Sequence, residues 1–277
     1  MSSNKVWLIT GCSSGLGRAI AKEALLSGAK VAVTARKLAD IQDFQKDFPH
    51  NALILSLDVT NQDQVKSTVE ETQKKLGRID ILVNNAACAI FGAIEEVPDK
   101  EVRRLFETNF FGLLDLTRTV LPIMRAQKSG HIINISALGG IVSTQCLGIF
   151  NASKFAIEGL TEALAQEVTG LGIKVSLIEP GPTRTSFLTR LQKFNSITDY
   201  EEVRTFISQI IDGYNGKQPG DPQKIAKTII QTVENPVPPL RLPLGKFSNE
   251  RIREKISELT TSMALWEKDS NNTDFDS

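Results

Sequence analysis

Three glycines at fixed spacing, directly after an apolar run, constrain the fold of this chain more than any other feature. Residues 6–10 form a short apolar run typical of a buried strand, and the run stops at Gly11. Gly15 and Gly17 follow at the start of a stretch with apolar residues at helical spacing. A second apolar run covers residues 30–35. Strand, glycine loop, helix and strand together predict a βαβ unit.

The same alternation continues along the chain. Further strands are predicted at 52–57, 79–83, 131–135, 174–178 and 240–244, and helices at about 40–48, 63–76, 101–125, 150–171, 222–233 and 249–267. Strands and helices that alternate at this spacing predict an α/β fold, a doubly wound, mostly parallel sheet with helices on both faces. Prolines bound the last strand, which places it at or near a sheet edge.

The domain organisation is simple. We find no linker, solenoid repeat or low-complexity segment, so we expect a single domain over residues 1–268. Residues 183–220 have weak helical patterning and many polar side chains, and we interpret them as a flap on the substrate side. Residues 269–277 are polar, and we expect them to be a disordered tail.

Composition excludes several classes of protein. The formal net charge is zero, so no basic surface indicates nucleic acid or an anionic membrane as a partner. No apolar run reaches the roughly 18 residues needed to span a bilayer, and the N-terminus lacks a signal-peptide pattern. Three widely spaced cysteines are typical of reduced thiols, which favours a cytoplasmic location. His50 and His131 lie far apart in sequence, and no metal site is expected.

The glycine loop suits a dinucleotide. Without side chains, the backbone can approach a pyrophosphate at a helix N-terminus, where free N–H groups favour anions. A merely tight turn between strand and helix is the alternative. The candidate pyrophosphate-binding residues are Gly11, Ser13, Ser14, Gly15, Leu16 and Gly17.

The end of the second strand indicates which dinucleotide binds. A carboxylate there would favour NAD, but Arg36 and Lys37 occupy the position and can attract the 2′-phosphate of NADP. The alternative is a solvated surface pair. Asp58, after the third strand, either accepts from the adenine amino group or caps the turn before Thr60.

A second cluster carries the chemistry. Phe150 and Lys154 are four residues apart and share one helical face, and Ser136 ends the preceding strand. A serine, an aromatic residue and a lysine brought together are typical of a proton-transfer site. Phenylalanine, however, has no proton to give.

Together these motifs resemble the short-chain dehydrogenases/reductases over nearly the whole chain, and within them the hydroxysteroid- and retinol-dehydrogenase-like carbonyl reductases. The matching residues are Thr10, Gly11, Gly15, Gly17, Asp58, Val59, Asn84, Asn85, Ala86, Asn109, Ser136, Ala152, Ser153, Lys154, Pro180 and Gly181. The resemblance implies a sheet of about seven strands and hydride transfer between NADP(H) and a small-molecule carbonyl or secondary alcohol.

The resemblance also implies individual roles. Asn109 would hold a water of a proton relay, Ser136 would bind the substrate oxygen, and Lys154 would hold the nicotinamide ribose and lower the pKa of a neighbouring phenol. Each residue also has a structural alternative. Asn109 would be a helix residue bonded to neighbouring backbone, Ser136 a strand-end cap and Lys154 a solvated lysine. Further cofactor contacts would come from Asp58, Val59, Asn85, Ala86, Pro180, Gly181, Thr183 and Thr185.

Two positions depart from the family pattern. Ala87 replaces a glycine, and Phe150 replaces the tyrosine that supplies the proton. General acid–base catalysis contributes roughly 10²–10⁴-fold, so the chain should bind cofactor but turn over poorly. It is then a Tyr-to-Phe form of a reductase, a naturally inactive NADP-binding sensor or scaffold, or an enzyme of another reaction, dehydration or epimerisation.

Substrate and assembly follow less directly. Apolar residues of the flap and near the site suggest a bulky apolar substrate, or they pack the flap onto the core; they are Phe187, Leu188, Leu191, Phe194, Ile197, Tyr200, Phe206 and Ile207, with Leu138, Ile141, Val142, Cys146 and Leu147. Arg184 and Arg190 would instead suit an acidic group. The helices at 101–125 and 150–171 resemble those that form dimer surfaces in the family, which implies a homodimer or homotetramer.

Overall fold

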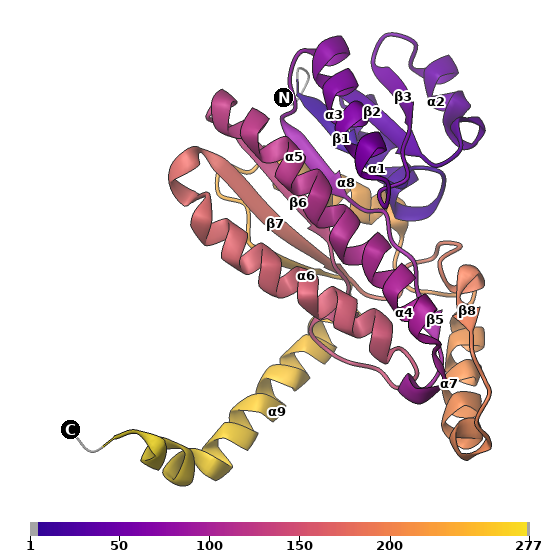
Figure 1. Cartoon of the computed structure of the whole chain (residues 1–277), viewed down its shortest axis with the longest axis vertical. Coiled ribbons are helices and arrows are strands. Elements are labelled where there is room, and N and C mark those ends of the chain that lie inside the picture. The colour runs from indigo at the N-terminus through magenta and orange to yellow at the C-terminus, as the bar shows by residue number, and fades with distance from the viewer. Residues whose placement is uncertain (1–4, 276–277) are drawn as a thin grey trace.

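Seven parallel strands form the central sheet of the protein, as the computed structural model of residues 5–275 shows (Figure 1). The strand order is β3-β2-β1-β4-β6-β7-β9. The bounds are β1 Val6–Ile9, β2 Lys30–Ala35, β3 Ala52–Ser56, β4 Ile81–Asn84, β6 Gly130–Ile135, β7 Ile173–Pro180 and β9 Arg241–Leu244. The predicted doubly wound α/β fold is confirmed, and the proline-containing strand β9 lies at one edge.

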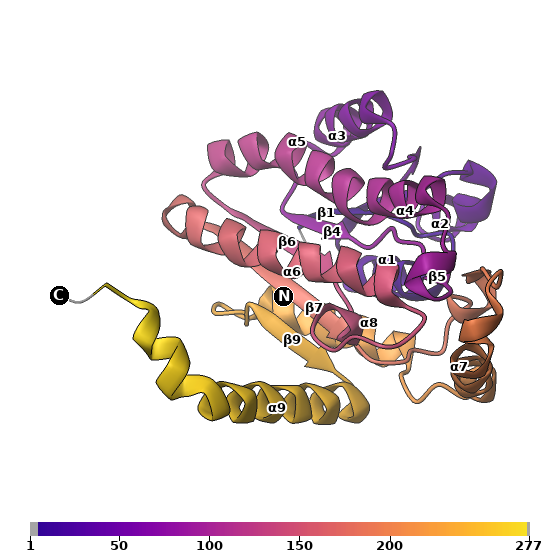
Figure 2. The same ribbon diagram turned by 60° about the horizontal axis from the view of Figure 1, so that its bottom comes forward.

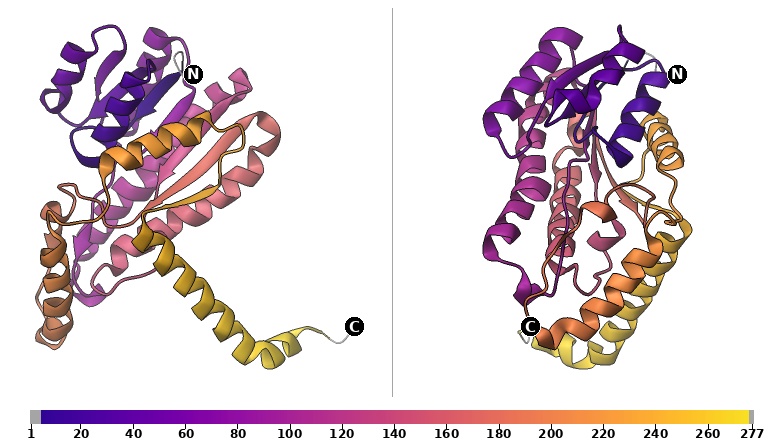
Figure 3. Two further views of the ribbon diagram at one scale, coloured as in Figure 1. Left: turned by 180° about the vertical axis from the view of Figure 1, so that it is seen from behind. Right: turned by 90° about the vertical axis from the view of Figure 1, so that its right-hand side faces the viewer.

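Helices cover both faces of the sheet (Figure 2). Helices α1 (Gly15–Leu26) and α8 (Pro222–Glu234) pack on one face, with the short α2 (Gln42–Asp47) beside them. Helices α3 (Gln62–Leu76), α5 (Gly112–Gln127) and α6 (Gly148–Glu167) pack on the other. Alternate residues of the inner strands enter the two cores: Trp7 and Ile9 of β1 face α1 and α8, and Leu8 faces the opposite layer. Figure 3 shows α8 lying across the sheet from behind.

Strands β2 and β3 are added on one side of β1 and the later strands on its other side, so the strand order reverses at β1. Strand β1 pairs in parallel with β2 on one side and with β4 on the other. In open α/β sheets, ligands bind beyond the carboxyl ends of the strands at such a switch point. The loops after β1 and β4 begin at Thr10 and Asn85 and therefore emerge side by side at the place where a dinucleotide is expected.

The helix predicted at 101–125 is interrupted. Helix α4 (Asp99–Phe106) runs into a π-helical turn over Glu107–Phe111 before α5 begins. Gly112 lies so close to Val59 that an added Cβ would stand 2.8 Å from the Val59 carbonyl oxygen. The wider turn carries Asn109, and π-turns inside helices are often found at functional sites.

The segment interpreted as a flap contains its own structure. Helix α7 (Glu201–Tyr214) follows a short strand, β8 (Gln192–Lys193), which pairs with β5 (Ile90–Phe91) in a small second sheet. Arg204 of α7 forms an ion pair with the fully buried side chain of Glu96. The Ile197 amide also donates to Glu96, at 3.0 Å. The flap is thus tied to the segment after β5.

The last helix, α9 (Lys246–Ser270), projects away from the sheet (Figures 1 and 2). It is longer than the predicted 249–267. The tail expected to be disordered from 269 begins instead as the end of α9, and Asn271–Thr273 add a 3-10 turn. Ser270 Oγ donates to the Glu267 carbonyl at 3.2 Å and so extends the helical bonding of a polar sequence. Residues 276–277 lie outside the described part. No described helix is both long and apolar enough to span a bilayer.

Candidate active site

The glycine loop is shaped for close backbone approach. Gly11 and Gly15 adopt positive φ angles of +71° and +59°, which glycine accepts at little cost. At Gly17 an added Cβ would overlap Asn85 Nδ2. Ser14 is the N-cap of α1, and its hydroxyl makes no capping bond. Bare backbone and a free hydroxyl at a helix N-terminus fit a diphosphate.

Thr10 holds this loop to the segment after β4. Its Oγ1 accepts hydrogen bonds from the amides of Asn85 and Ala86, both at 2.9 Å. The Asn85 side chain donates in return to the Thr10 carbonyl at 2.8 Å. Asn85 therefore fixes the two loops to each other. Its contact with the adenosine stays a prediction.

The end of β7 meets the same loop. Thr185 lies against Gly15, where an added Cβ would stand 3.3 Å from the Thr185 Cβ. Thr183 Oγ1 donates to the Gly181 carbonyl at 2.9 Å, and the Gly181 amide donates to Leu244 of β9. Thr185 was predicted to border the nicotinamide. Its contact with Gly15 places it next to the loop predicted to bind the pyrophosphate.

Arg36 and Lys37 are exposed just after β2, and neither forms an ion pair within residues 5–275. Asp58 is engaged locally: its Oδ1 accepts from the Thr60 amide at 3.0 Å and from Thr60 Oγ1 at 2.8 Å. The turn-capping role of Asp58 is thus visible. The adenine contact stays a prediction.

Asn109 is buried and held at both ends of its amide. Its Oδ1 accepts from the Cys88 amide at 2.8 Å, while Nδ2 donates to the Cys88 carbonyl at 2.9 Å and to Ser153 Oγ at 3.0 Å. The Ser153 hydroxyl donates to the Phe150 carbonyl at 2.7 Å. Asn109 therefore joins the loop after β4 to helix α6, a link between distant segments that the alternative of bonding to neighbouring backbone did not include. Its predicted role in holding a water stays a prediction.

Lys154 points into the molecule from α6. Its Nζ donates to the Ile135 carbonyl at 2.7 Å and lies 5.8 Å from the centre of the Phe150 ring. Burial lowers the pKa of its ammonium group to about 8. Lys154 is thus not a solvated surface lysine. The Ile135 contact places it at the end of β6, beside Ser136 in the chain.

Ser136 and Phe150 flank one turn. An added Cβ at Gly140 would stand 2.5 Å from Ser136 Oγ, and one at Gly139 would stand 3.4 Å from a ring carbon of Phe150. The buried Ser136 hydroxyl lies beside the Glu158 carboxylate, and this contact acts against the rise that burial causes in the pKa of Glu158. The Phe150 ring packs in an apolar cluster and lies 5.7 Å from the ring of Phe187 in the flap.

Sequence reasoning missed a buried group of acids behind these residues. Glu158 and Glu179 are almost fully buried, and one carboxylate oxygen of Glu179 has no hydrogen bond in the part described. Arg241 of β9 lies 3.1 Å from Glu158 and 3.9 Å from Glu179. Burial, with Glu158 nearby, raises the pKa of Glu179 to about 7. One signal was available: Glu158 lies four residues after Lys154, on the same helical face.

Much of the apolar flap packs inward. Leu191 and Phe194 contact the cluster around Phe150, and Ile207 and Cys146 belong to a neighbouring cluster. Phe187 and Phe206 keep 38% and 59% of their surface exposed. Some of the apolar flap residues therefore pack the flap onto the core, as the alternative in the sequence analysis had it, whereas Phe187 lies against Phe150 at the site.

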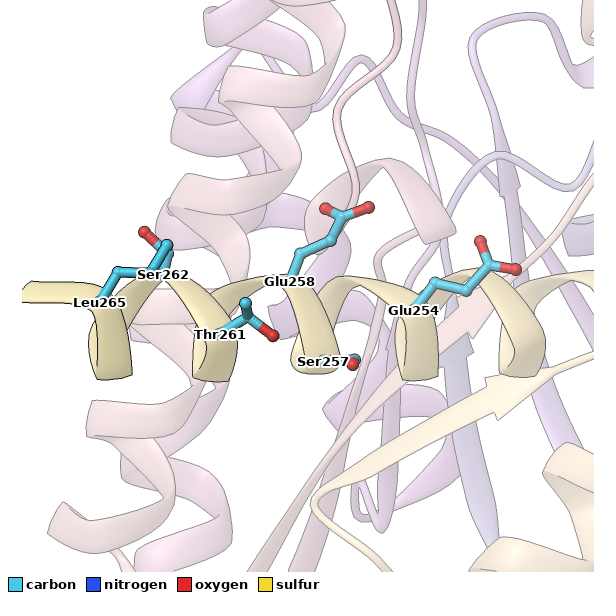
Figure 4. A pocket seen from close by; sticks show the side chains of 6 residues that line it. All are labelled: Glu254, Ser257, Glu258, Thr261, Ser262 and Leu265. Carbon is cyan, nitrogen blue, oxygen red and sulfur yellow. The ribbon is translucent and has the colours of Figure 1, made fainter.

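The surface hollows do not add to the site, and the suggestion that Arg184 and Arg190 would suit an acidic group stays a prediction. Arg184 donates to the Gln218 carbonyl at 3.2 Å, so its guanidinium is already engaged. A hollow of about 600 Å³ lies along α9 and is lined by Glu254, Ser257, Glu258, Thr261, Ser262 and Leu265 (Figure 4). A second, of about 290 Å³, lies on α4 and the π-turn. Neither is lined by the site residues.

Glycine loop, serine, lysine and doubly wound sheet define a class of nicotinamide-dependent oxidoreductases. The model of the short chain dehydrogenase family matches residues 5–196, and the chain belongs to this family. It is similar to oxidoreductase BOA17 of Botryotinia fuckeliana, 34% identical over 95% of this chain and 96% of the relative. It is also similar to 3-ketodihydrosphingosine reductase of Bacteroides thetaiotaomicron, 36% identical over 94% of each.

Solved structures agree with this assignment. A short-chain dehydrogenase from Streptomyces avermitilis is 38% identical, with a TM-score of 0.91 over 99% of this chain and 100% of that one. A metagenomic short-chain oxidoreductase in complex with NADP is 26% identical, with a TM-score of 0.69 over 87% and 96%. A 3-ketoacyl-(acyl-carrier-protein) reductase from Brucella melitensis complexed with NADH is 26% identical, with a TM-score of 0.75 over the same shares. The cofactor class is a nicotinamide dinucleotide.

Proposed function

We propose that this protein has the site of an NADP(H)-dependent carbonyl reductase and that Phe150 stands where the reaction needs a proton donor. The observation that carries the proposal is the placement of the buried Ser136 hydroxyl and the buried Lys154 ammonium group together at the end of β6. A hydroxyl donor suits a substrate oxygen that becomes negative as hydride adds.

Each residue then has a chemical task. Bound nicotinamide supplies or accepts the hydride. Ser136 donates to the substrate oxygen, and Lys154 keeps two of its three donors for the nicotinamide ribose. Asn109 fixes α6 against the loop after β4 and so sets the position of Phe150. The Phe150 ring preserves the apolar packing but has no proton for the product alkoxide.

Preference for NADP(H) rests on Arg36 and Lys37. Both are exposed beyond β2 without an ion pair in the described chain, and so are available to a 2′-phosphate. NADPH should therefore bind more tightly than NADH. Replacing Arg36 with alanine should remove most of the difference, while the exposed Lys22 on α1 is a matched control.

A bulky apolar ketone is the substrate class we favour. Phe187 contacts Phe150 from the flap, and apolar residues of the flap surround that contact. The name of the relative from Bacteroides, a 3-ketodihydrosphingosine reductase, supports a ketone on a long chain. We also propose a homodimer or homotetramer built on α5 and α6, where Phe111 and Phe155 expose 45% and 44% of their surface nearby.

Restoring a phenol at position 150 tests the proposal. The Phe150→Tyr variant should oxidise NADPH roughly 10²–10⁴-fold faster than the parent on long-chain and cyclic ketones. The measurement is NADPH absorbance over a ketone panel, with NADH as the comparison cofactor. Phe206→Tyr, at an exposed phenylalanine of α7, is the control and should leave the rate unchanged.

One result would overturn the reductase assignment. It is a folded Phe150→Tyr protein that binds NADPH, seen by the fluorescence of the bound cofactor, yet oxidises none of it across the panel. The alternative, a natural NADP-binding sensor or scaffold, would then stand. Product analysis would distinguish dehydration or epimerisation from reduction.

A further inference from the structure

Helix α9 carries a row of exposed apolar side chains that the rest of the protein leaves uncovered. Ile256, Leu259, Met263 and Trp266 expose 56%, 52%, 73% and 66% of their surface. Ile252, half-buried, begins the row one turn earlier. Steps of four, three, four and three residues place all five on one narrow stripe, the spacing with which helices pair in coiled coils.

The opposite face of α9 is different. The hollow in Figure 4 is lined by two glutamates, two serines and a threonine, with Leu265 as the one apolar side chain. At 100° per residue, these positions lie across the helix from the apolar row. The helix thus has one apolar stripe and one mainly polar face although it projects from the body. A partner should therefore lie along the stripe.

Charges that flank the stripe indicate what the partner is. Arg253 and Lys255 border its first half, Thr260 and Ser262 its middle, and Glu267 and Asp269 its last half. Arg253 and Glu267 are exposed, and neither has an ion pair in the described chain, whereas Lys255 lies 3.8 Å from Glu258 of its own helix. The residues that flank the stripe are basic near its start and acidic near its end. They are therefore complementary to those of a second copy that runs in the opposite direction.

We propose that two copies of this chain associate through an antiparallel pair of α9 helices. With Leu259 against Met263 of the partner subunit, Arg253 faces Glu267 of the partner subunit and Lys255 faces Asp269 of the partner subunit, each twice around a two-fold axis. Parallel pairing places Lys255 by a threonine and Glu267 by a serine, with no opposite charges.

A membrane surface fits the stripe less well. Five basic and five acidic residues between Lys246 and Ser270 leave α9 with no net charge. Helices that lie on anionic membranes are instead rich in lysine and arginine on the polar face.

Charge reversal tests the pairing in the full-length protein. Arg253→Glu and Glu267→Arg should each halve the mass measured by light scattering, because each places like charges opposite one another twice. The double variant should recover the parent mass. An equimolar mixture of the two single variants should recover it as well, since one copy then offers two acids and the other two bases.

Cross-linking gives an independent measure of direction. In the antiparallel pair the two Thr260 residues face each other across the axis, so Thr260→Cys should form a disulfide between subunits. Thr261→Cys, one residue on and on the hollow face, should not. Circular dichroism and NADPH binding should match the parent throughout, which separates this test from that of the proposed function. A monomeric parent, unchanged masses in the single variants, or a double variant that stays dissociated would overturn the proposal.

Discussion

At the scale of single residues, buried acids behind the site make stability depend on pH. Glu179 is 1% exposed, and its pKa is raised to about 7 from the ordinary value of 4.5. The folded protein therefore binds more protons than the unfolded chain between these two values. Stability falls as pH rises through that window, because an added charge is then buried beside Glu158.

Glu179→Gln should remove this dependence. The variant should match the parent near pH 4.5 and exceed its unfolding free energy at pH 8 by about 1–3 kcal/mol, since no charge is buried. Urea unfolding at the two pH values measures the difference. Glu162→Gln, at the half-exposed acid that also pairs with Arg241, is the control and should shift neither value. An equal change in unfolding free energy between the two pH values in the parent and in Glu179→Gln would contradict the raised pKa of Glu179.

Residues in local motifs could be predicted from the sequence, and residues that depend on distant contacts could not. Gly11, Gly15 and Lys154 stand in short patterns whose spacing alone places them on a loop or a helical face. Arg241 contacts Glu158 from a position 83 residues later in the chain, and no local spacing indicates that contact. The Thr10 hydroxyl was likewise overlooked as the group that joins the loops after β1 and β4.

At the scale of elements, one ion pair ties the flap to the body. The Glu96 side chain is fully buried and Arg204 is 13% exposed. Burial acts to raise the pKa of Glu96, but the amides of Ile197 and Ala93 and the guanidinium of Arg204 together hold it below its usual value. A buried carboxylate that loses its cation is left without compensation.

Arg204→Met should loosen the flap without unfolding the sheet. We expect its local opening free energy to fall by about 3 kcal/mol, seen as faster amide hydrogen exchange over 183–220. Tyr200→Phe removes a neighbouring exposed bond to Glu95 and should cost less than about 1 kcal/mol. Adding Glu96→Gln to Arg204→Met should return part of the protection. Unchanged exchange in Arg204→Met would show that the apolar contacts of the flap suffice.

Most predicted strands and helices lie within a few residues of their predicted ranges, and two features that the pattern did not indicate are informative. Strands and surface helices were predictable because apolar periodicity marks them directly. The π-turn at 107–111 was not, since its contacts, Gly112 with Val59 and Asn109 with Cys88, join segments that lie far apart in the sequence. The strand pair β5–β8 is only two residues long on each side, too short for alternation to show.

At the scale of the whole molecule, the alternation of strands and helices was sufficient to predict one doubly wound sheet. It did not indicate that α9 leaves the body, because a helix with an apolar stripe is ordinarily expected to pack on its own sheet. The apolar stripe can be identified from the sequence, but the direction that α9 takes after Gly245 cannot. Gly245 precedes α9 with a φ of +98°, a conformation that other residues rarely adopt.

The packing of α8 on α1 has a consequence for the order of events during synthesis. Ile20 and Ala24 of α1 share a core with Ile229 and Ile230, about 200 residues later in the chain. At 5–20 residues per second, the nascent chain carries an uncovered apolar helix face for roughly 10–40 s. We expect it to need chaperone shielding over that interval. A chain ended at Gly220 should stay protease-sensitive and aggregate, whereas one ended at Gly245 should resist proteolysis. Equal resistance of the two would show that the N-terminal half closes its core alone.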